Sequence, residues 1–269
     1  MKPQKEVLNL RLLMNNLKNI LHSFVFILLM LGMVNSGSAQ KSIRDSAIII
    51  PHIDLVYSFQ LPAGDLVNRF GFYHTIGGAF YVKDRKGFVY GFDGQVQFGD
   101  QLKEDPITNF TTSNNQVING DGNYATMKGS MRGFRFTGQF GKVFNILSPN
   151  PNSGLKVIVG AGFWQHRIRV EDTENKVAQV KFPYQNGYDR MTNGFMLTEF
   201  VGYQFFSESR LVNFYFGVEF NQGFTKNRRK YNFSEKRRDD RSRLDLSYGF
   251  KLGWVIPMYR RAPKEFYYN

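Results

Sequence analysis

Residues 244–256 read LDLSYGFKLGWVI. In this stretch every even-numbered residue is apolar, whereas the odd-numbered residues are Asp, Ser, Gly or Lys until Val255 is reached. Successive side chains of a β-strand point to opposite faces, so a period of two indicates a strand with one apolar and one polar face. This segment is therefore predicted to be a strand that separates two different environments.

The same alternation recurs along most of the chain. The segment 194–206 is the exception, because Glu199 falls on the same face as Phe195, Leu197 and Val201. A bulge or a change of register in this segment therefore stays open. We expect eight strands, at residues 49–61, 70–83, 88–99, 133–146, 154–169, 194–206, 211–224 and 244–256.

The volume of the side chains decides which face points outward. An eight-stranded barrel has an interior that side chains can only just fill, so the many large apolar residues do not fit inside it. Several glycines, among them Gly91, Gly162 and Gly249, fall on the polar face, where a crowded interior favours small residues. We therefore expect the apolar face to point outward into lipid.

The connections between the strands alternate in length. Residues 84–86, 147–153 and 207–209 are short, and the other connections are residues 62–69, 100–132, 170–193 and 225–243, all long except the first. Outer-membrane barrels have short periplasmic turns and longer extracellular loops. The predicted fold is therefore an all-β, eight-stranded antiparallel up-and-down transmembrane β-barrel over residues 47–257.

An apolar run, FVFILLMLGMV at residues 24–34, lies near the amino terminus. Cations precede it and small residues up to Ala39 follow it, which is typical of a secretory signal peptide. Residues 1–39 are thus predicted to be a cleaved signal peptide and 40–46 a periplasmic segment, with residues 258–269 as a periplasmic tail. A retained anchor helix is the alternative, although the run is short for a membrane span.

Composition narrows the class of partner. The chain holds 35 Lys and Arg residues against 22 Asp and Glu, a formal net charge of +13. A positive charge of this size is typical of proteins that bind nucleic acid. An exported protein, however, encounters envelope lipids before it encounters nucleic acid, so we expect no nucleic-acid partner. The chain has no Cys, which excludes disulfides and a lipid attached to Cys.

Charged residues of both signs fall on the inward face of the predicted strands. In a closed interior they are expected to pair and to plug the lumen, because unpaired buried charges are costly. The alternative is a path for protons or ions, for which eight strands leave little room. The residues of this predicted lumen charge network are Asp54, Asp93, Arg135, Lys156, Glu219, Asp245 and Lys251.

The segment 226–243 holds nine cations and three anions within a predicted extracellular loop. Such a loop is suited to neutralising the phosphates of lipopolysaccharide, and Arg can do so through bidentate contacts. A solvated hairpin tip is the competing interpretation. The predicted lipopolysaccharide-contacting residues are Lys226, Arg228, Arg229, Lys230, Lys236, Arg237 and Arg238.

No catalytic, metal or cofactor site is predicted. His74 and His166 lack the neighbouring nucleophile and orienting group that acyl transfer requires. The sequence Asn-Gly-Asp-Gly at 119–122 fits a turn or hairpin better than a metal loop, because its carboxylates lack the ligand spacing. A lipid-modifying enzyme that uses His74 or His166 remains the alternative to a protein without catalytic activity.

With these features together, residues 47–257 resemble small outer-membrane barrels of the OmpA and OmpX kind. The segments PAGDLVNRFG (62–71) and NGYDRMTNGF (186–195) are similar in style to uncharacterised barrels of Bacteroidota. The resemblance implies a non-enzymatic outer-membrane protein with a filled lumen, acting in envelope integrity or as a surface or assembly partner through its loops. It also leaves open an accessory role in a type IX secretion or gliding complex. The expected partners are outer-membrane lipid, lipopolysaccharide and an envelope protein.

Overall fold

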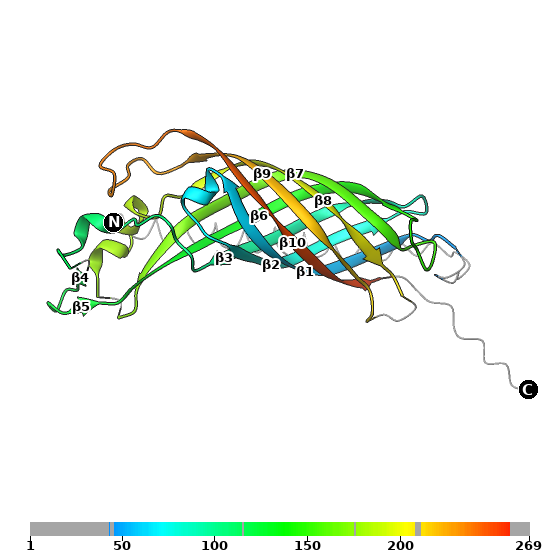
Figure 1. Ribbon diagram of the computed structural model, residues 1–269, viewed down its shortest axis with the longest axis horizontal. Coiled ribbons are helices and arrows are strands. Elements are labelled where there is room, and N and C mark those ends of the chain that lie inside the picture. The colour runs from blue at the N-terminus through cyan, green and yellow to red at the C-terminus, as the bar shows by residue number, and fades with distance from the viewer. Residues whose placement is uncertain (1–42, 44–45, 115, 175, 208–210, 259–269) are drawn as a thin grey trace, which may run out of the picture. The chain divides into compact units, whose positions relative to one another are not determined.

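The computed structural model describes residues 43, 46–114, 116–174, 176–207 and 211–258. Eight strands form one closed antiparallel barrel in the order β1-β10-β9-β8-β7-β6-β3-β2, which confirms the predicted fold class (Figure 1). The strands of the barrel are β1 (Ile50–Gly64), β2 (Tyr73–Lys83), β3 (Phe88–Gly99), β6 (Met127–Phe144), β7 (Gly154–Asp172), β8 (Thr192–Phe205), β9 (Phe214–Asn227) and β10 (Ser242–Pro257). The predicted signal peptide, residues 1–39, lies outside the described residues.

The connections divide the barrel into a short-turn end and a long-loop end, which lie at opposite ends in Figure 1. The connections at the long-loop end contain a small hairpin and, in the described residues, four short 3₁₀ helices, of which η1 lies in the shorter connection between β1 and β2. These elements are β4 (Val117–Ile118), β5 (Tyr124–Ala125), η1 (Leu66–Asn68), η2 (Thr108–Phe110), η3 (Ala178–Val180) and η4 (Tyr184–Gly187). No helix in the described part of the chain is long and apolar enough to cross a membrane.

The hairpin β4–β5 contains the Asn-Gly-Asp-Gly sequence, so the prediction of a hairpin at this point is confirmed. The side-chain oxygen of Asn119 accepts hydrogen bonds from the backbone N–H groups of Asp121 and Asn123, each at 3.0 Å. An Asn side chain that bonds to the following backbone in this way stabilises a turn. This local bonding accounts for a hairpin in a loop that has little apolar content.

Six strands extend further at the long-loop end than the alternation predicts, and β6 extends the furthest. β6 begins at Met127 and β7 ends at Asp172, and these two residues are paired. Backbone pairing can continue where both faces of a strand contact water. In such a stretch apolar and polar residues no longer alternate along the sequence. The sequence pattern therefore reveals only the part of each strand that separates lipid from the interior.

The strand at 194–206 is regular, and no bulge interrupts it. β8 pairs without interruption with β7 and with β9, and Glu199 is opposite Val159 on one side and Phe220 on the other. The Glu199 side chain is exposed on the outward face of the barrel. The break in alternation is therefore a real carboxylate on the apolar wall, and the register of the strand is unchanged.

Burial confirms that the apolar face points outward. On β10 the outward Phe250 is 69% exposed, whereas the next residue, Lys251, is 3% exposed. Glycine on the inward face relieves crowding, because a Cβ at Gly162 would lie 2.0 Å from the backbone oxygen of Phe136. An outward wall of large apolar side chains on this scale is stable against lipid and not against water.

Aromatic side chains with polar tips mark the short-turn end of this wall. The hydroxyl of Tyr203 donates to the backbone oxygen of Leu147 at 2.7 Å, and Nε1 of Trp254 donates to that of Leu211 at 2.8 Å. Tyr and Trp are enriched where the apolar part of a bilayer meets water. These residues therefore mark one border of the membrane-spanning band.

Candidate functional site: the lumen and its outer mouth

The centre of the lumen holds a compact set of four charged side chains, here called the lumen cluster: Asp93, Arg135, Glu219 and Lys251. Nζ of Lys251 is 2.7 Å from Oδ2 of Asp93 and 2.9 Å from Oε1 of Glu219. Nη2 of Arg135 is 2.6 Å from the other oxygen of Glu219. Two cations and two carboxylates from four strands therefore neutralise one another inside the barrel.

Glutamine side chains add hydrogen bonds to the lumen cluster, although Nη1 of Arg135 has no partner in the described part of the chain. Gln60 donates to Glu219 at 2.9 Å, and Gln95 donates to Asp93 at 2.7 Å while its oxygen accepts from Arg135 at 2.9 Å. A buried ion pair is tolerated when its remaining lone pairs and protons find partners. The cluster consequently fills and braces the lumen.

The remaining residues of the predicted network lie elsewhere in the lumen. Asp54 is 2.6 Å from Nδ1 of His52. Asp245 is 2.9 Å from Nε2 of His166 and accepts a hydrogen bond from Thr225. The seven predicted residues thus do not form a single connected network, because strand register separates them along the barrel axis.

Lys156 has no carboxylate partner among the described residues. Its Nζ donates to Oε1 of Gln204 at 3.0 Å and lies 3.8 Å from the ring centroid of Tyr215 and 4.9 Å from that of Tyr81. Aromatic rings attract a cation through their negative faces, and more strongly when water is excluded. The ammonium is therefore held by an amide and two rings.

The short-turn end of the lumen is closed by residues before β1. The side chain of Asn152 donates to the backbone oxygens of Ile43 and Ser46 and accepts from the backbone N–H of Ile48. Nζ of Lys83 also donates to Asn152, at 3.0 Å. Asn152 therefore fastens the segment that precedes β1 against the end of the barrel.

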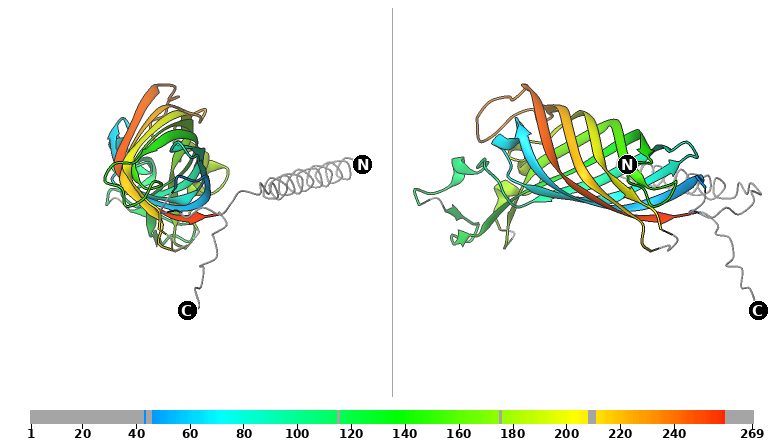
Figure 2. Two further views of the ribbon diagram at one scale, coloured as in Figure 1. Left: turned by 90° about the vertical axis from the view of Figure 1, so that its right-hand side faces the viewer. Right: turned by 45° about the vertical axis from the view of Figure 1, so that its right-hand side comes forward.

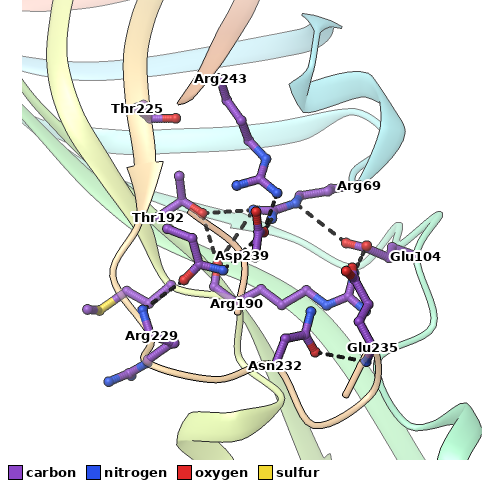
Figure 3. A network of polar contacts seen from close by, with 12 residues as sticks. Arg69, Glu104, Arg190, Thr192, Thr225, Arg229, Asn232, Glu235, Asp239 and Arg243 are labelled. Carbon is purple, nitrogen blue, oxygen red and sulfur yellow. Dashed lines mark hydrogen bonds and ion pairs between the residues drawn. The ribbon is translucent and has the colours of Figure 1, made fainter. Parts of the chain in front are cut away.

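The long-loop end is closed by a second charged set, which we call the mouth network (Figure 3). Its members come from four different connections or strand ends, and they are Arg69, Glu104, Arg190, Asp239 and Arg243. Arg69 lies 3.5 Å from Glu104 and 3.7 Å from Asp239, and its Nη1 donates to Thr192 at 2.8 Å. Arg190 also pairs with Glu104, and Arg243 pairs with Asp239 at 2.5 Å.

Burial shifts the titration of the mouth network. Burial, followed by repulsion from Arg243, lowers the pKa of Arg69 to about 10. Burial also lowers the pKa of Arg190 to about 10, against the attraction of Glu235. Burial raises the pKa of Asp239, but hydrogen bonds from Arg243 and Asn227 outweigh it and hold the pKa below its ordinary value. At neutral pH these groups are charged, so the network holds as ion pairs.

The cations of the basic loop, residues 226–243, fall into two groups, those paired with another side chain and those without such a partner. Arg229 makes a bidentate contact with Asp189, Arg228 donates to Oδ1 of Asn193 at 2.6 Å, and Arg237 lies 2.6 Å from Glu235. The side chains of four predicted lipopolysaccharide-contacting residues have no hydrogen bond or ion pair in the described part of the chain, and all four are exposed: Lys226, Lys230, Lys236 and Arg238.

No pattern in the sequence predicts the mouth network. Arg69 and Arg190 lie in the segments 62–71 and 186–195, whose resemblance to other barrels indicates no ion pair between them. A single Arg beside turn residues gives no sign of its partner, and Arg69 and Thr192 are 123 residues apart in sequence. No signal in the sequence connects the two loops.

Among the described residues, His166 is paired with the carboxylate of Asp245, but neither candidate histidine lies beside a Ser hydroxyl that could act as a nucleophile. Nδ1 of His74 lies 2.7 Å from the Tyr57 hydroxyl on the outward wall, and its ring contacts Phe59, Phe72 and Phe98. His166 is enclosed by Asp245, Phe70 and Trp164. In the described residues neither histidine contacts a Ser hydroxyl, and no group of three His, Cys, Asp or Glu side chains is placed to hold a metal ion.

A scan of protein-family models and a search of curated proteins give no match. Among solved structures, Neisserial surface protein A is 11% identical, with 78% of this chain and 97% of that chain covered and a TM-score of 0.39. Ail of Yersinia pestis, solved in complex with the heparin analogue sucrose octasulfate, is 9% identical over 77% and 99% of the two chains, with a TM-score of 0.36.

OprG of Pseudomonas aeruginosa is 10% identical, with 79% of this chain and 97% of that chain covered and a TM-score of 0.31. At these values the similarities carry no conclusion about function.

Proposed function

We propose that this chain is a non-enzymatic barrel of a Gram-negative outer membrane, exported by a signal peptide that is cut after Ala39, and that its long loops contact lipopolysaccharide outside the cell. The loops act as a prearranged surface, and the filled lumen serves to hold the barrel rigid. The observation that carries the proposal is the mouth network, which ties four connections together while leaving Lys226, Lys230, Lys236 and Arg238 open.

The physical argument is one of preorganisation. A flexible cationic loop loses conformational entropy when it binds, whereas a loop that is already fixed loses less. Asp189 holds Arg229, and Glu235 is shared between Arg190 and Arg237. These pairs hold Asp189 and Glu235 on other cations, so the four exposed cations without an ion pair are available to phosphate groups.

The test uses two matched double variants of the full chain in lipid vesicles. One variant is Lys230→Gln with Arg238→Gln at the long-loop end. The other is Arg85→Gln with Lys86→Gln, an exposed Arg and Lys at the short-turn end. We expect the first to weaken lipopolysaccharide binding about tenfold at low salt and the second to leave it unchanged, since each surface contact contributes roughly 0.5–1 kcal/mol.

Equal binding by both variants, or binding of the wild type that does not fall with added salt, contradicts the proposed contact. An effect of the Arg85 and Lys86 changes alone would place the contact at the wrong end. An envelope protein partner, including one in a secretion or gliding complex, would be recognised by the same loops and is distinguished by binding that survives removal of lipid A phosphates.

A further inference from the structure

Glu199 is a carboxylate on the lipid-facing wall, midway along β8. In the described strands, the outward-facing Asp and Glu residues are Glu199 and, at the long-loop end of β7, Glu171. On β8 it lies between Leu197 and Val201, within the apolar band bounded by Tyr203. An ionisable side chain on the lipid face of a barrel is destabilising and is by default a sign of function.

Gln222 on the neighbouring strand β9 makes the one side-chain hydrogen bond that Glu199 has among the described residues. Its Nε2 donates to Oε1 of Glu199 at 3.3 Å. Within the described chain, the second oxygen of Glu199 and the second N–H of Gln222 have no partner. The wall thus presents, side by side, an acceptor and a donor that lipid tails cannot satisfy.

The wall beside this pair is hollowed. A groove of about 770 Å³ runs from Phe80 on β2 across β3 and β6 to Leu197 on β8, next to Glu199, and has Gly138 and Ala161 among its lining residues. Packing inside the barrel does not require the glycine, because a Cβ at Gly138 would meet its nearest atom at 3.9 Å. Small residues on a membrane-facing surface allow another backbone to approach closely.

We propose that this surface, formed by Glu199, Gln222 and the hollow at Gly138 and Ala161, is the contact between two copies of this chain in the membrane. A two-fold axis along the membrane normal sets the β7 side of one copy against the β9 side of the other at equal depth. The free N–H of each Gln222 then donates to the Glu199 of the other copy. In this arrangement Phe220 of one copy, which is 45% exposed on β9, faces the hollow beside Ala161 of the other copy.

The wall itself favours a second copy over a cationic partner. The outward Lys and Arg residues in the described strands lie near the strand ends, for example Lys142, Arg167 and Lys226, and not at the depth of Glu199. The proposed contact therefore joins the amide of Gln222 to the carboxylate of Glu199. Each copy of the chain carries both groups. A different partner would have to carry its own polar group into the hydrocarbon.

The chain contains no Cys, so single-Cys crosslinking of the full protein in liposomes is a direct test. Val201→Cys places a thiol next to Glu199, and Leu55→Cys places one on β1, which does not line the hollow and lies three strands from β8, with similar exposure. We expect oxidation to crosslink the first variant and not the second. Heat-modifiable gel mobility verifies that each variant is folded.

Substitutions of Glu199 then test whether hydrogen bonds from Gln222 hold the two copies together. In the Val201→Cys background, E199L is expected to lower the dimer fraction about tenfold, since two symmetric intramembrane hydrogen bonds are lost. E199Q keeps the hydrogen bonds and is expected to retain the dimer. Equal crosslinking at Val201 and Leu55, equal loss in both Glu199 variants, or no loss in either overturns the proposal, as does crosslinking of Val201→Cys only to a different protein in cells.

Discussion

The residues of the lumen cluster hold one another in place. Each charged side chain would lower the stability of the barrel if its partners were removed. Lys251 contacts both Asp93 and Glu219, and all three side chains are at most 3% exposed. Removing one member of a buried ion pair is more destabilising than replacing the whole set, because the remaining charge stays buried without compensation. The loss of a single charged residue of this cluster is therefore expected to destabilise the barrel.

Lys251→Met is the sharpest test at the residue scale. It leaves Asp93 and Glu219 with one cation between them, and we expect a loss of about 3–5 kcal/mol in the free energy of unfolding. Urea unfolding in lipid vesicles, followed by gel mobility and tryptophan fluorescence, measures this change. The control Lys251→Met with Asp93→Asn restores neutrality and is expected to recover a large part of the stability. Equal free energies of unfolding for Lys251→Met and the wild type would show that the ion pairs of Lys251 do not stabilise the barrel.

At the scale of elements, the long connections are joined to one another through the mouth network. Arg69 follows η1, Glu104 follows β3, Arg190 precedes β8, and Asp239 precedes β10. Long loops of a barrel are ordinarily its most mobile parts, because they have few buried contacts. Here the ion pairs supply those contacts, so the order of one loop depends on the others.

This dependence predicts a pH response centred on Asp239. Because the folded-state pKa of Asp239 is lowered, its stabilising contribution is present above the ordinary carboxyl range near pH 4 and is lost as the pH falls through the lower folded value. Hydrogen exchange of residues 228–241 is therefore expected to accelerate as the pH is lowered below about 4, beyond the intrinsic change in rate.

Asp239→Asn separates this response from general acid effects. In this variant the loop is expected to exchange rapidly at pH 7 already, and the acid-dependent increase should vanish, while the barrel strands remain protected. An unchanged exchange rate at pH 7 would mean that Asp239 does not fasten the loop.

At the scale of the whole molecule, the lumen is blocked at three levels: by Asn152 and the segment before β1, by the lumen cluster and by the mouth network. Figure 2 shows the barrel with its strands tilted around this interior. An eight-stranded barrel has an interior that its own side chains fill. The protein should therefore hold its shape and let few ions pass.

Planar bilayer recordings test this closure. We expect the wild type to show no stable conductance steps, whereas Arg135→Ala with Glu219→Ala removes two large side chains and keeps the charge balanced, so it should open small steps. The double variant Thr75→Ala with Ser58→Ala, which shortens two inward side chains on β1 and β2, is the control and should stay silent. Large steps from the wild type would contradict a filled lumen.

The alternation of residues was sufficient to predict strand number, pairing of neighbours and the outward apolar face. It was sufficient because strand geometry places successive side chains on opposite faces whatever the partner strand is. It did not find the true ends of β6 and β7, since alternation disappears where both faces are wet. It also left open a bulge at Glu199, because a polar residue on an apolar face and a shift of register give the same local pattern.

The sequence by itself thus determined the barrel and the kinds of side chain that line each surface. Only the tertiary structure decided which of them meet: Lys251 with Asp93 and Glu219, Arg69 with Glu104 and Asp239, and Glu199 with Gln222. The physical reason is that faces follow from local backbone geometry, whereas contacts across the lumen and between loops depend on register and closure, which involve residues far apart in the chain.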